Sequence, residues 1–245
     1  MNDVIAIIPA RSGSKSIPDK NIALLAGYPL IAFSIIAAKL SKKIQRVIVS
    51  TDSSEYAEIA RSYGAETPFI RPKEYARDES TDRAFLLHAI NWFEENEAKC
   101  PEYWVHLRPT TPLRVPSLID QAVEALMDCQ QATSLRSAHK APESPLKWFS
   151  KSEDGFFNGL MPKTFGVEGF NLPKEQFEDI FIPDGYIDVI KKSHILNSQS
   201  IHGRNILAFE SPVCSEVDSK EEFEYIEFQI QKHGSEILEY LKANY

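Results

Sequence analysis

Residues 4–21 read VIAIIPARSGSKSIPDKN, an apolar run that ends at Pro9 and continues as a loop rich in Ser, Gly and Lys. A short, uninterrupted β-branched run is typical of a strand that is buried on both faces, as in a parallel sheet. Similar runs return at 46–50 and 103–107, and segments with helical apolar spacing lie between them. This alternation indicates βαβ units with right-handed crossovers. The sequence therefore predicts an α/β fold of three layers, Rossmann-like, with a mostly parallel sheet.

The remaining elements follow from periodicity and from turn chemistry. Ser53 offers an N-cap to a helix that Gly64 ends, and Pro116 suits the first turn of another helix. Helices are expected at 30–40, 54–63, 82–97, 116–129 and 220–240, and further strands at 132–135, 186–190 and 206–209.

The loop after the first strand has the composition of a phosphate-binding loop. Ser12, Gly13 and Ser14 are small, so backbone N–H groups can converge on a phosphate at close range. Arg11 offers a forked cation for two phosphate oxygens, and Lys20 adds a point charge. The loop is not a Walker A motif, because G-x-x-x-x-G-K-[ST] is absent. We interpret it as a site for a polyphosphate, with a solvated Ser/Lys turn as the alternative.

Composition excludes several classes of protein. The 27 Lys and Arg against 35 Asp and Glu give the 245-residue chain a net charge of −8, whereas nucleic acids and anionic membranes attract basic proteins. No run approaches the ~18 apolar residues of a membrane span, and the N-terminus lacks the pattern of a signal peptide. The widely spaced Cys100, Cys129 and Cys214 form neither a disulfide framework nor a metal motif. We expect a cytoplasmic protein that binds no nucleic acid and no membrane.

An irregular stretch interrupts the alternation of strands and helices at 137–182. It is rich in proline and in aromatic residues, among them Trp148, Phe149, Phe156, Phe157, Phe165 and Phe170. So many aromatic side chains cannot all stay in water. We therefore expect one α/β domain, made of 1–136 and 183–245, with an inserted arm at 137–182 that packs against the domain or against another subunit.

Ligands of open α/β sheets bind outside the carboxyl ends of the strands, which selects the loops at 9–21, 50–53, 108–114 and 216–218. These loops and three further segments carry short motifs, which are IPARSGSKSIPDKN (8–21), STD (50–52), FIRP (69–72), RPTTPLR (108–114), SPLK (144–147), PDG (183–185) and EVDS (216–219). In this order, the motifs resemble those of the acylneuraminate cytidylyltransferases, the family of CMP-sialic acid and CMP-nonulosonate synthetases. The resemblance covers nearly the whole chain.

The resemblance implies a nucleotidyltransferase. In this family the anomeric hydroxyl of a nine-carbon α-keto acid attacks the α-phosphorus of CTP and releases pyrophosphate with the help of Mg²⁺. The acceptor would be a sialic, legionaminic, pseudaminic or related nonulosonic acid, activated for a surface glycan. The resemblance also implies a homodimer in which the arm of one subunit reaches the neighbour's site. Two alternatives stay open: use of a sugar phosphate or another nucleoside triphosphate, and a nucleotide-binding homologue without catalytic activity.

The same resemblance assigns roles to individual residues. It implies that Ala10, Arg11, Ser14, Lys20, Asn21, Arg71 and Ser80 hold the nucleotide, and that Arg108, Lys147, Lys174, Gln176 and Phe181 hold the acceptor. Arg11, Lys20 and Asp218 are the expected catalytic residues. Fixed cations lower the barrier because negative charge builds on the nonbridging and leaving oxygens. Without the resemblance, Arg71 and Lys147 are ordinary surface cations.

Glu216 and Asp218 are the expected ligands of Mg²⁺. They stand at alternate positions of an expected strand end, which would point both carboxylates to one side of the sheet. Two carboxylates together with substrate phosphates and waters are a common way to hold Mg²⁺. The alternative for Asp218 is the N-cap of the closing helix.

Three residues depart from the family pattern. Arg108 replaces Gln, which predicts either a more anionic or otherwise altered acceptor, or a local ion pair with Glu216. Lys174 replaces Arg and loses the forked contact to a carboxylate. Glu216 replaces Asp and is one methylene longer.

Overall fold

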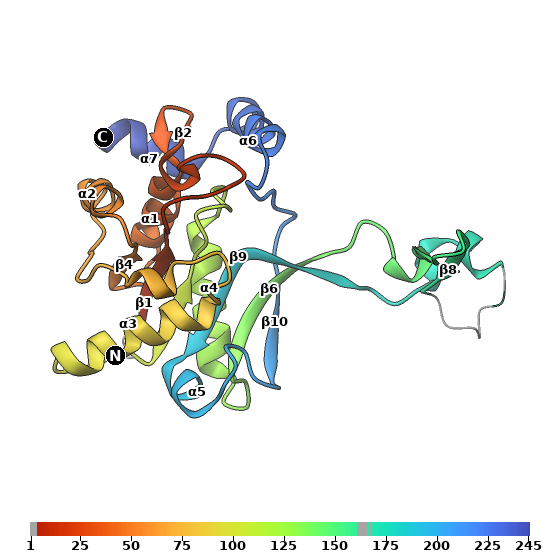
Figure 1. Cartoon of the computed structure of the whole chain (residues 1–245), viewed down its shortest axis with the longest axis horizontal. Helices are drawn as coiled ribbons and strands as arrows, with labels where there is room; N and C mark the ends of the chain where they lie inside the picture. Colours follow the sequence, from red (N-terminus) through yellow and green to blue (C-terminus); the bar gives the residue numbers. More distant parts are fainter. Residues whose placement is uncertain (1–3, 161–165, 167) are drawn as a thin grey trace.

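The computed structural model describes residues 4–160, 166 and 168–245. Its centre is a six-stranded sheet with the order β10-β6-β9-β5-β1-β4 (Figure 1). The strands are β1 (Val4–Pro9), β4 (Arg46–Ser50), β5 (Tyr103–His106), β6 (Ser134–Lys140), β9 (Phe181–Lys191) and β10 (Ile206–Glu210). β1 pairs in parallel with β4 and β5, and β6 pairs in parallel with β10. β9 is antiparallel to both of its neighbours, β5 and β6, and the other five strands of this sheet all run in one direction. The expected mostly parallel sheet is therefore confirmed.

Helices cover both faces of the sheet and complete the three expected layers. The helices are α1 (Leu30–Leu40), α2 (Ser54–Ser62), α3 (Asp82–Asn96), α4 (Pro116–Asp128), α5 (Lys192–Asn197), α6 (Lys220–His233) and α7 (Glu236–Asn244). Alternate β1 residues point to opposite sides: Ile8 belongs to an apolar cluster with residues of α1, α2, α4, α6 and α7, whereas Ile7 belongs to a second cluster with residues of α3 and α5. β1 is therefore buried on both faces, as its β-branched sequence predicts. No helix within the described ranges is long and apolar enough to cross a membrane.

Two sequence expectations about the helices meet different outcomes. Ser53 caps α2, since its side chain accepts a hydrogen bond from the Tyr56 N–H, and Gly64 follows that helix with a φ of +87°. The prediction of a single closing helix at 220–240 is wrong. Gly234 adopts a φ of +72° and ends α6, and the Ser235 side chain then caps a second helix, α7.

An arm projects from the body and is carried by two strands of the central sheet, β6 and β9, which run across the expected boundaries at 137 and 182. β6 and β9 continue beyond the body as an antiparallel pair, from Ala138 opposite Pro183 to Lys140 opposite Phe181 (Figure 1). A register shift between Arg136 and Ala138 marks a bulge where this pair leaves the sheet. The distal part holds a hairpin of β7 (Phe149–Lys151) and β8 (Phe157–Gly159). Of the aromatic residues expected in the arm, Phe165 lies outside the described residues.

Candidate functional site

A cleft of about 410 Å³ opens at the carboxyl ends of β1, β4 and β5. This is the edge at which α/β sheets bind ligands. The structure brings seven of the predicted site residues together in its lining: Arg11, Ser14, Lys20, Asn21, Arg71, Ser80 and Arg108. Ala10 does not line the cleft, because it is fully buried and its N–H donates to the Ser50 carbonyl (2.9 Å).

The loop after β1 is held in place by polar contacts from neighbouring loops. The Asp52 carboxylate accepts hydrogen bonds from the backbone N–H and the hydroxyl of Ser12, both at 2.8 Å. The Asn21 amide donates to the Arg11 carbonyl (3.0 Å) and closes the loop on itself. Gly13 has a φ of +70°, a conformation that favours glycine. The loop is therefore an ordered wall of the cleft and not a free solvated turn.

Two cations of the loop share one carboxylate. Asp78 contacts Arg11 Nη2 at 2.8 Å and Lys15 Nζ at 2.5 Å. The hydrogen bond from Lys15 and the charge of Arg11 hold the pKa of Asp78 below its ordinary value. The sequence did not single out Asp78, because it lies in a polar loop without a motif. In the structure it neutralises cations that would otherwise be available to a phosphate.

Lys20 reaches the cleft from a buried position, with a side chain that is 11% exposed. Its ammonium group donates to the Val217 carbonyl (2.7 Å) and to Asp218 Oδ1 (3.0 Å). These contacts join the first loop to the segment before α6, nearly 200 residues later in the chain. The ammonium group of Lys20 is consequently held in one position. A preorganised charge of this kind is what electrostatic stabilisation of a reacting phosphate requires.

Arg71 is a buried part of the cleft wall and not a surface cation. Its Nε donates to the Ser50 hydroxyl (2.9 Å), Nη2 donates to the Ser50 carbonyl, and the guanidinium lies 5.0 Å from the centre of the Phe85 ring. Burial lowers the pKa of Arg71 to about 10. The side chain still carries its charge at neutral pH and presents it to the cleft.

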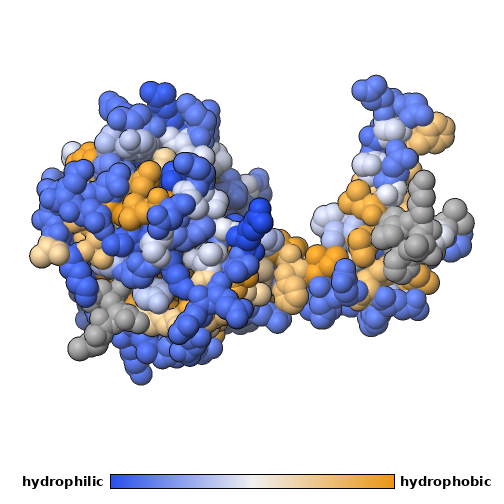
Figure 2. Space-filling view, turned by 90° about the horizontal axis from the view of Figure 1, so that it is seen from below, coloured by the Kyte–Doolittle hydropathy of each residue, from blue (hydrophilic) through white to orange (hydrophobic). Residues whose placement is uncertain are grey.

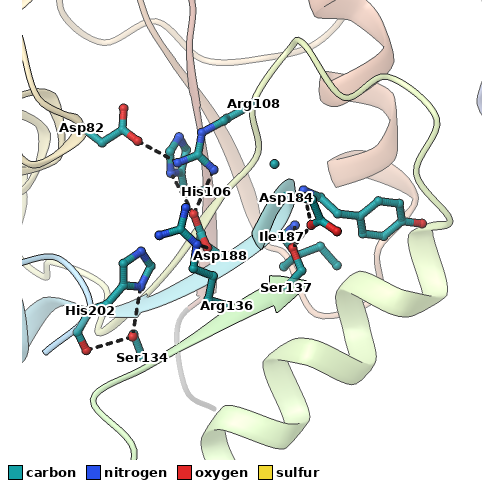
Figure 3. Close-up of polar contacts among 12 residues, drawn as sticks. Asp82, His106, Arg108, Ser134, Arg136, Ser137, Asp184, Ile187, Asp188 and His202 are labelled. Atoms are coloured by element: carbon teal, nitrogen blue, oxygen red, sulfur yellow. Dashed lines mark hydrogen bonds and ion pairs between the residues drawn. The ribbon is translucent and has the colours of Figure 1, made fainter. Parts of the chain in front are cut away.

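Arg108 also lines the cleft and bridges two carboxylates (Figure 3). Its Nη1 contacts Asp188 Oδ2 at 2.9 Å and its Nη2 contacts Asp82 Oδ2 at 2.7 Å. The expected alternative, an ion pair with Glu216, is wrong. Asp188 lies on β9, 80 residues after Arg108, so only the folded sheet reveals this partner.

The segment that carries Glu216 and Asp218 is not a strand, so the expected period-two geometry is wrong. The Val217 side chain is buried, and its N–H donates to the Thr110 carbonyl (2.8 Å). Glu216 Oε1 accepts the Gly185 N–H (2.7 Å), and Asp218 Oδ1 accepts from Lys20. Each carboxylate keeps one oxygen without a hydrogen bond among the described residues, and hard carboxylate oxygens suit Mg²⁺. The Ser219 side chain, not Asp218, caps α6.

The four acceptor residues expected on the arm lie away from the cleft of their own chain. Lys147 and Lys174 line a separate cavity of about 320 Å³ with Pro142, Glu143 and Ser144. The Lys147 ammonium also donates to the Leu172 carbonyl (2.9 Å). Gln176 ends a short 3₁₀-helix, and Phe181 is 42% exposed at the start of β9. None of the four lines the 410 Å³ cleft.

At the base of the arm, Asp184 links three segments of the chain. Its carboxylate accepts from Ser137 Oγ (2.5 Å), Ser211 Oγ (2.5 Å) and His139 Nδ1 (3.0 Å). Burial raises its pKa, but these hydrogen bonds outweigh burial and hold the pKa of Asp184 below its ordinary value. Cys214 approaches the same carboxylate and completes a His–Asp–Cys group within 4.8 Å. The contacts fasten β6, β9 and the segment after β10 together.

Comparison with known proteins agrees with this geometry. A family model described as "Cytidylyltransferase" matches residues 5–148, a range that contains every residue lining the cleft. An N-acylneuraminate cytidylyltransferase of Escherichia coli is 31% identical over 96% of this chain, and the chain spans 54% of that protein's length. A CMP-N,N'-diacetyllegionaminic acid synthase of Legionella pneumophila is 40% identical over 66% of this chain and 68% of its own length.

The fold has close solved counterparts as well. A CMP:2-keto-3-deoxy-manno-octonic acid synthetase complexed with CTP superposes with a TM-score of 0.71 at 16% identity, covering 94% of this chain and 99% of its own. This similarity shows the fold, and the sequence matches through the cleft show the family. The chain belongs to the cytidylyltransferase family of nucleotidyltransferase enzymes.

Proposed function

We propose that the protein transfers CMP from CTP to the anomeric hydroxyl of a nonulosonic acid and releases pyrophosphate. The observation that carries this proposal is the convergence of Arg11, Lys20 and Arg71 on one cleft in a chain whose net charge is −8. Cations concentrated at one place in an acidic protein suit a polyphosphate. The relatives named above act on N-acylneuraminic and legionaminic acids, which supports a keto-acid sugar as the acceptor.

In this reaction the acceptor oxygen forms a bond to the α-phosphorus as the bond to the pyrophosphate oxygen breaks. Arg11 and Lys20 would bind the phosphates and stabilise the charge that develops on their oxygens. Ser14, Asn21, Arg71 and Ser80 would hold the nucleotide in the same cleft. Glu216 and Asp218 would hold Mg²⁺, which neutralises phosphate charge when it is bound. The product is proposed to be an activated sugar for a surface glycan, made in the cytoplasm.

We propose further that the protein works as a homodimer in which the arm completes the neighbour's site. Figure 2 shows the arm projecting from the body with apolar side chains on its surface. Phe156 and Phe157 are 70% and 71% exposed, which is unfavourable unless another surface covers them. The cavity with Lys147 and Lys174 offers two cations for a carboxylate, yet it lies outside the chain's own cleft.

The dimer is tested by light scattering coupled to gel filtration. The expected mass is twice the 27.7 kDa of one chain. The double variant F156S/F157S should shift the protein towards the monomer without lowering the melting temperature of its core. The double variant Y225S/F228S, on the exposed side of α6, is the matched control and should remain dimeric. A wild-type monomer with full activity would remove the dimer from the proposal.

A pyrophosphate-release assay tests the function. CTP, GTP, UTP and ATP are each combined with N-acetylneuraminic, legionaminic and pseudaminic acids and with a sugar 1-phosphate. We expect release only with CTP and a nonulosonic acid, and only when Mg²⁺ is present. Turnover with the sugar 1-phosphate alone would reassign the acceptor. CTP binding without turnover on any acceptor would instead favour a nucleotide-binding homologue without activity.

A further inference from the structure

The Arg108 guanidinium, which lines the cleft, is held between a buried and an exposed carboxylate (Figure 3). Asp188, on the β9 strand, is 1% exposed, and Asp82, at the start of α3, is 40% exposed. The two contacts, at 2.9 and 2.7 Å, use two of the five N–H groups that a guanidinium carries. Arg108 is therefore fixed in orientation and keeps donors for a further partner.

The charges around Arg108 balance one another. Arg136, on β6, contacts the other oxygen of Asp188 at 3.7 Å, so two guanidinium groups face two carboxylates. Burial, followed by the charge of Arg108, keeps the pKa of His106 well below its ordinary value. Burial likewise lowers the pKa of His202, so neither imidazole adds charge near neutral pH. The positive charge of Arg108 is consequently already compensated inside the protein.

The cations that line the cleft differ in their partners. Asp78 pairs with Arg11 and Lys15, Asp218 pairs with Lys20, and Arg71 forms no ion pair with the described residues. Asp82 lines the cleft beside Arg108, and its Oδ1 accepts no hydrogen bond from the described residues. A carboxylate or phosphate placed there would meet the charge of Asp82. A hydroxyl or amide N–H would instead find an acceptor in Asp82, and an amide carbonyl would find a donor in Arg108.

We propose that Asp82 and Arg108 determine acceptor specificity by recognising a neutral amide substituent of the sugar, its N–H through Asp82 and its carbonyl through Arg108. This inference rests on the proposed function and adds the chemistry that the site selects. It replaces the expectation that Arg108 marks a more anionic acceptor, because two carboxylates already use its charge. The acceptor's own carboxylate is then left for cations elsewhere, such as Lys147 and Lys174 on the arm.

The test compares two acceptors that differ in one group: N-acetylneuraminic acid and its analogue with a hydroxyl in place of the acetamido group. Values of kcat/KM are measured for wild type, Asp82→Asn and Arg108→Lys, with the KM for CTP as a second readout. Asparagine keeps the shape of Asp82, and lysine keeps a cation beside Asp188 but loses the fork. We expect wild type to prefer the acetamido acid, and each variant to lose about tenfold or more of that preference, the value of a hydrogen bond to a charged group.

The KM for CTP should stay within about threefold of wild type in both variants, since Arg11 and Lys20 keep their own ion pairs with Asp78 and Asp218. Arg136→Gln is the matched control, because Arg136 contacts the same Asp188 without lining the cleft, and it should keep the wild-type preference. Unchanged preference in Asp82→Asn and Arg108→Lys would overturn the inference. The inference would also be overturned if wild type preferred an acceptor with an additional phosphate and Arg108→Lys abolished that preference. If wild type turns over no nonulosonic acid with CTP, the proposed function itself fails.

Discussion

Replacing Lys20 with methionine removes a single charge from the cleft and keeps most of the volume of the side chain. The ammonium group of Lys20 is anchored by the Val217 carbonyl and by Asp218, at 2.7 and 3.0 Å, and it points a fixed charge at the site proposed for the phosphates. Loss of one preorganised donor of this kind costs about 2–4 kcal/mol of transition-state stabilisation. At about 1.4 kcal/mol per factor of ten, kcat/KM should fall by roughly 30- to 800-fold.

The variant should also lose stability, because the Val217 carbonyl is left without its donor. A buried acceptor without a partner costs about 1–3 kcal/mol, which urea unfolding followed by circular dichroism can measure. Pyrophosphate release and CTP binding by calorimetry separate this loss from the effect on the reaction. Lys39→Met is the matched control, since the Lys39 ammonium bonds to Tyr63 and Tyr245 away from the cleft. If Lys20→Met binds CTP and turns over within threefold of wild type, the assignment of the phosphate site to this loop is refuted.

Three further changes probe other parts of the structure. Asp78→Asn should tighten CTP binding in calorimetry, because it frees Arg11 from a competing carboxylate, and weaker binding would argue that Asp78 takes part in the site. Between pH 7 and pH 5.5, the free energy of unfolding should fall by about 1 kcal/mol less in His106→Phe than in wild type. The pKa of His106 is depressed in the folded protein, so only the unfolded chain takes up that proton as the pH falls below about 6.5, and an unchanged pH dependence would contradict this. Gly234→Ala should cost about 1–3 kcal/mol in urea unfolding, since its φ of +72° and ψ of 177° suit glycine alone, and a stability equal to wild type would contradict the strain.

Local pattern was enough to predict the parts of the fold that are buried on both faces. The β-branched runs became β1 and β4, and the apolar spacing at Leu30–Leu40 became α1 with the expected bounds. Most residues of these segments are buried among apolar side chains, so the hydrophobic pattern decides the structure. The loop cations could be predicted because they follow directly after the first strand, at the edge of the sheet where ligands bind.

Long-range partners could not be predicted, because sequence spacing carries no information about them. Arg108 finds Asp188 across 80 residues, and Lys20 finds Val217 across 197. The direction of β9 was equally hidden, since a strand that is buried on both faces reads as a continuous apolar run whichever way it points. Gly234 breaks the closing helix although the pattern around it stays helical, because a single φ outweighs propensity there.

The bulge at the base of the arm has a mechanical consequence. Two strands pass from the sheet into the arm with a register shift between Arg136 and Ala138, so we expect backbone pairing there, and not the tip itself, to set the direction in which the tip points. Exchanging residues 141–180, the tip of the arm, for those of a relative should therefore change which surface the tip contacts but not the length or the direction of the arm. Inserting or deleting one residue at the bulge should have the opposite effect. The tip would keep its own structure but would point away from the surface that it contacts.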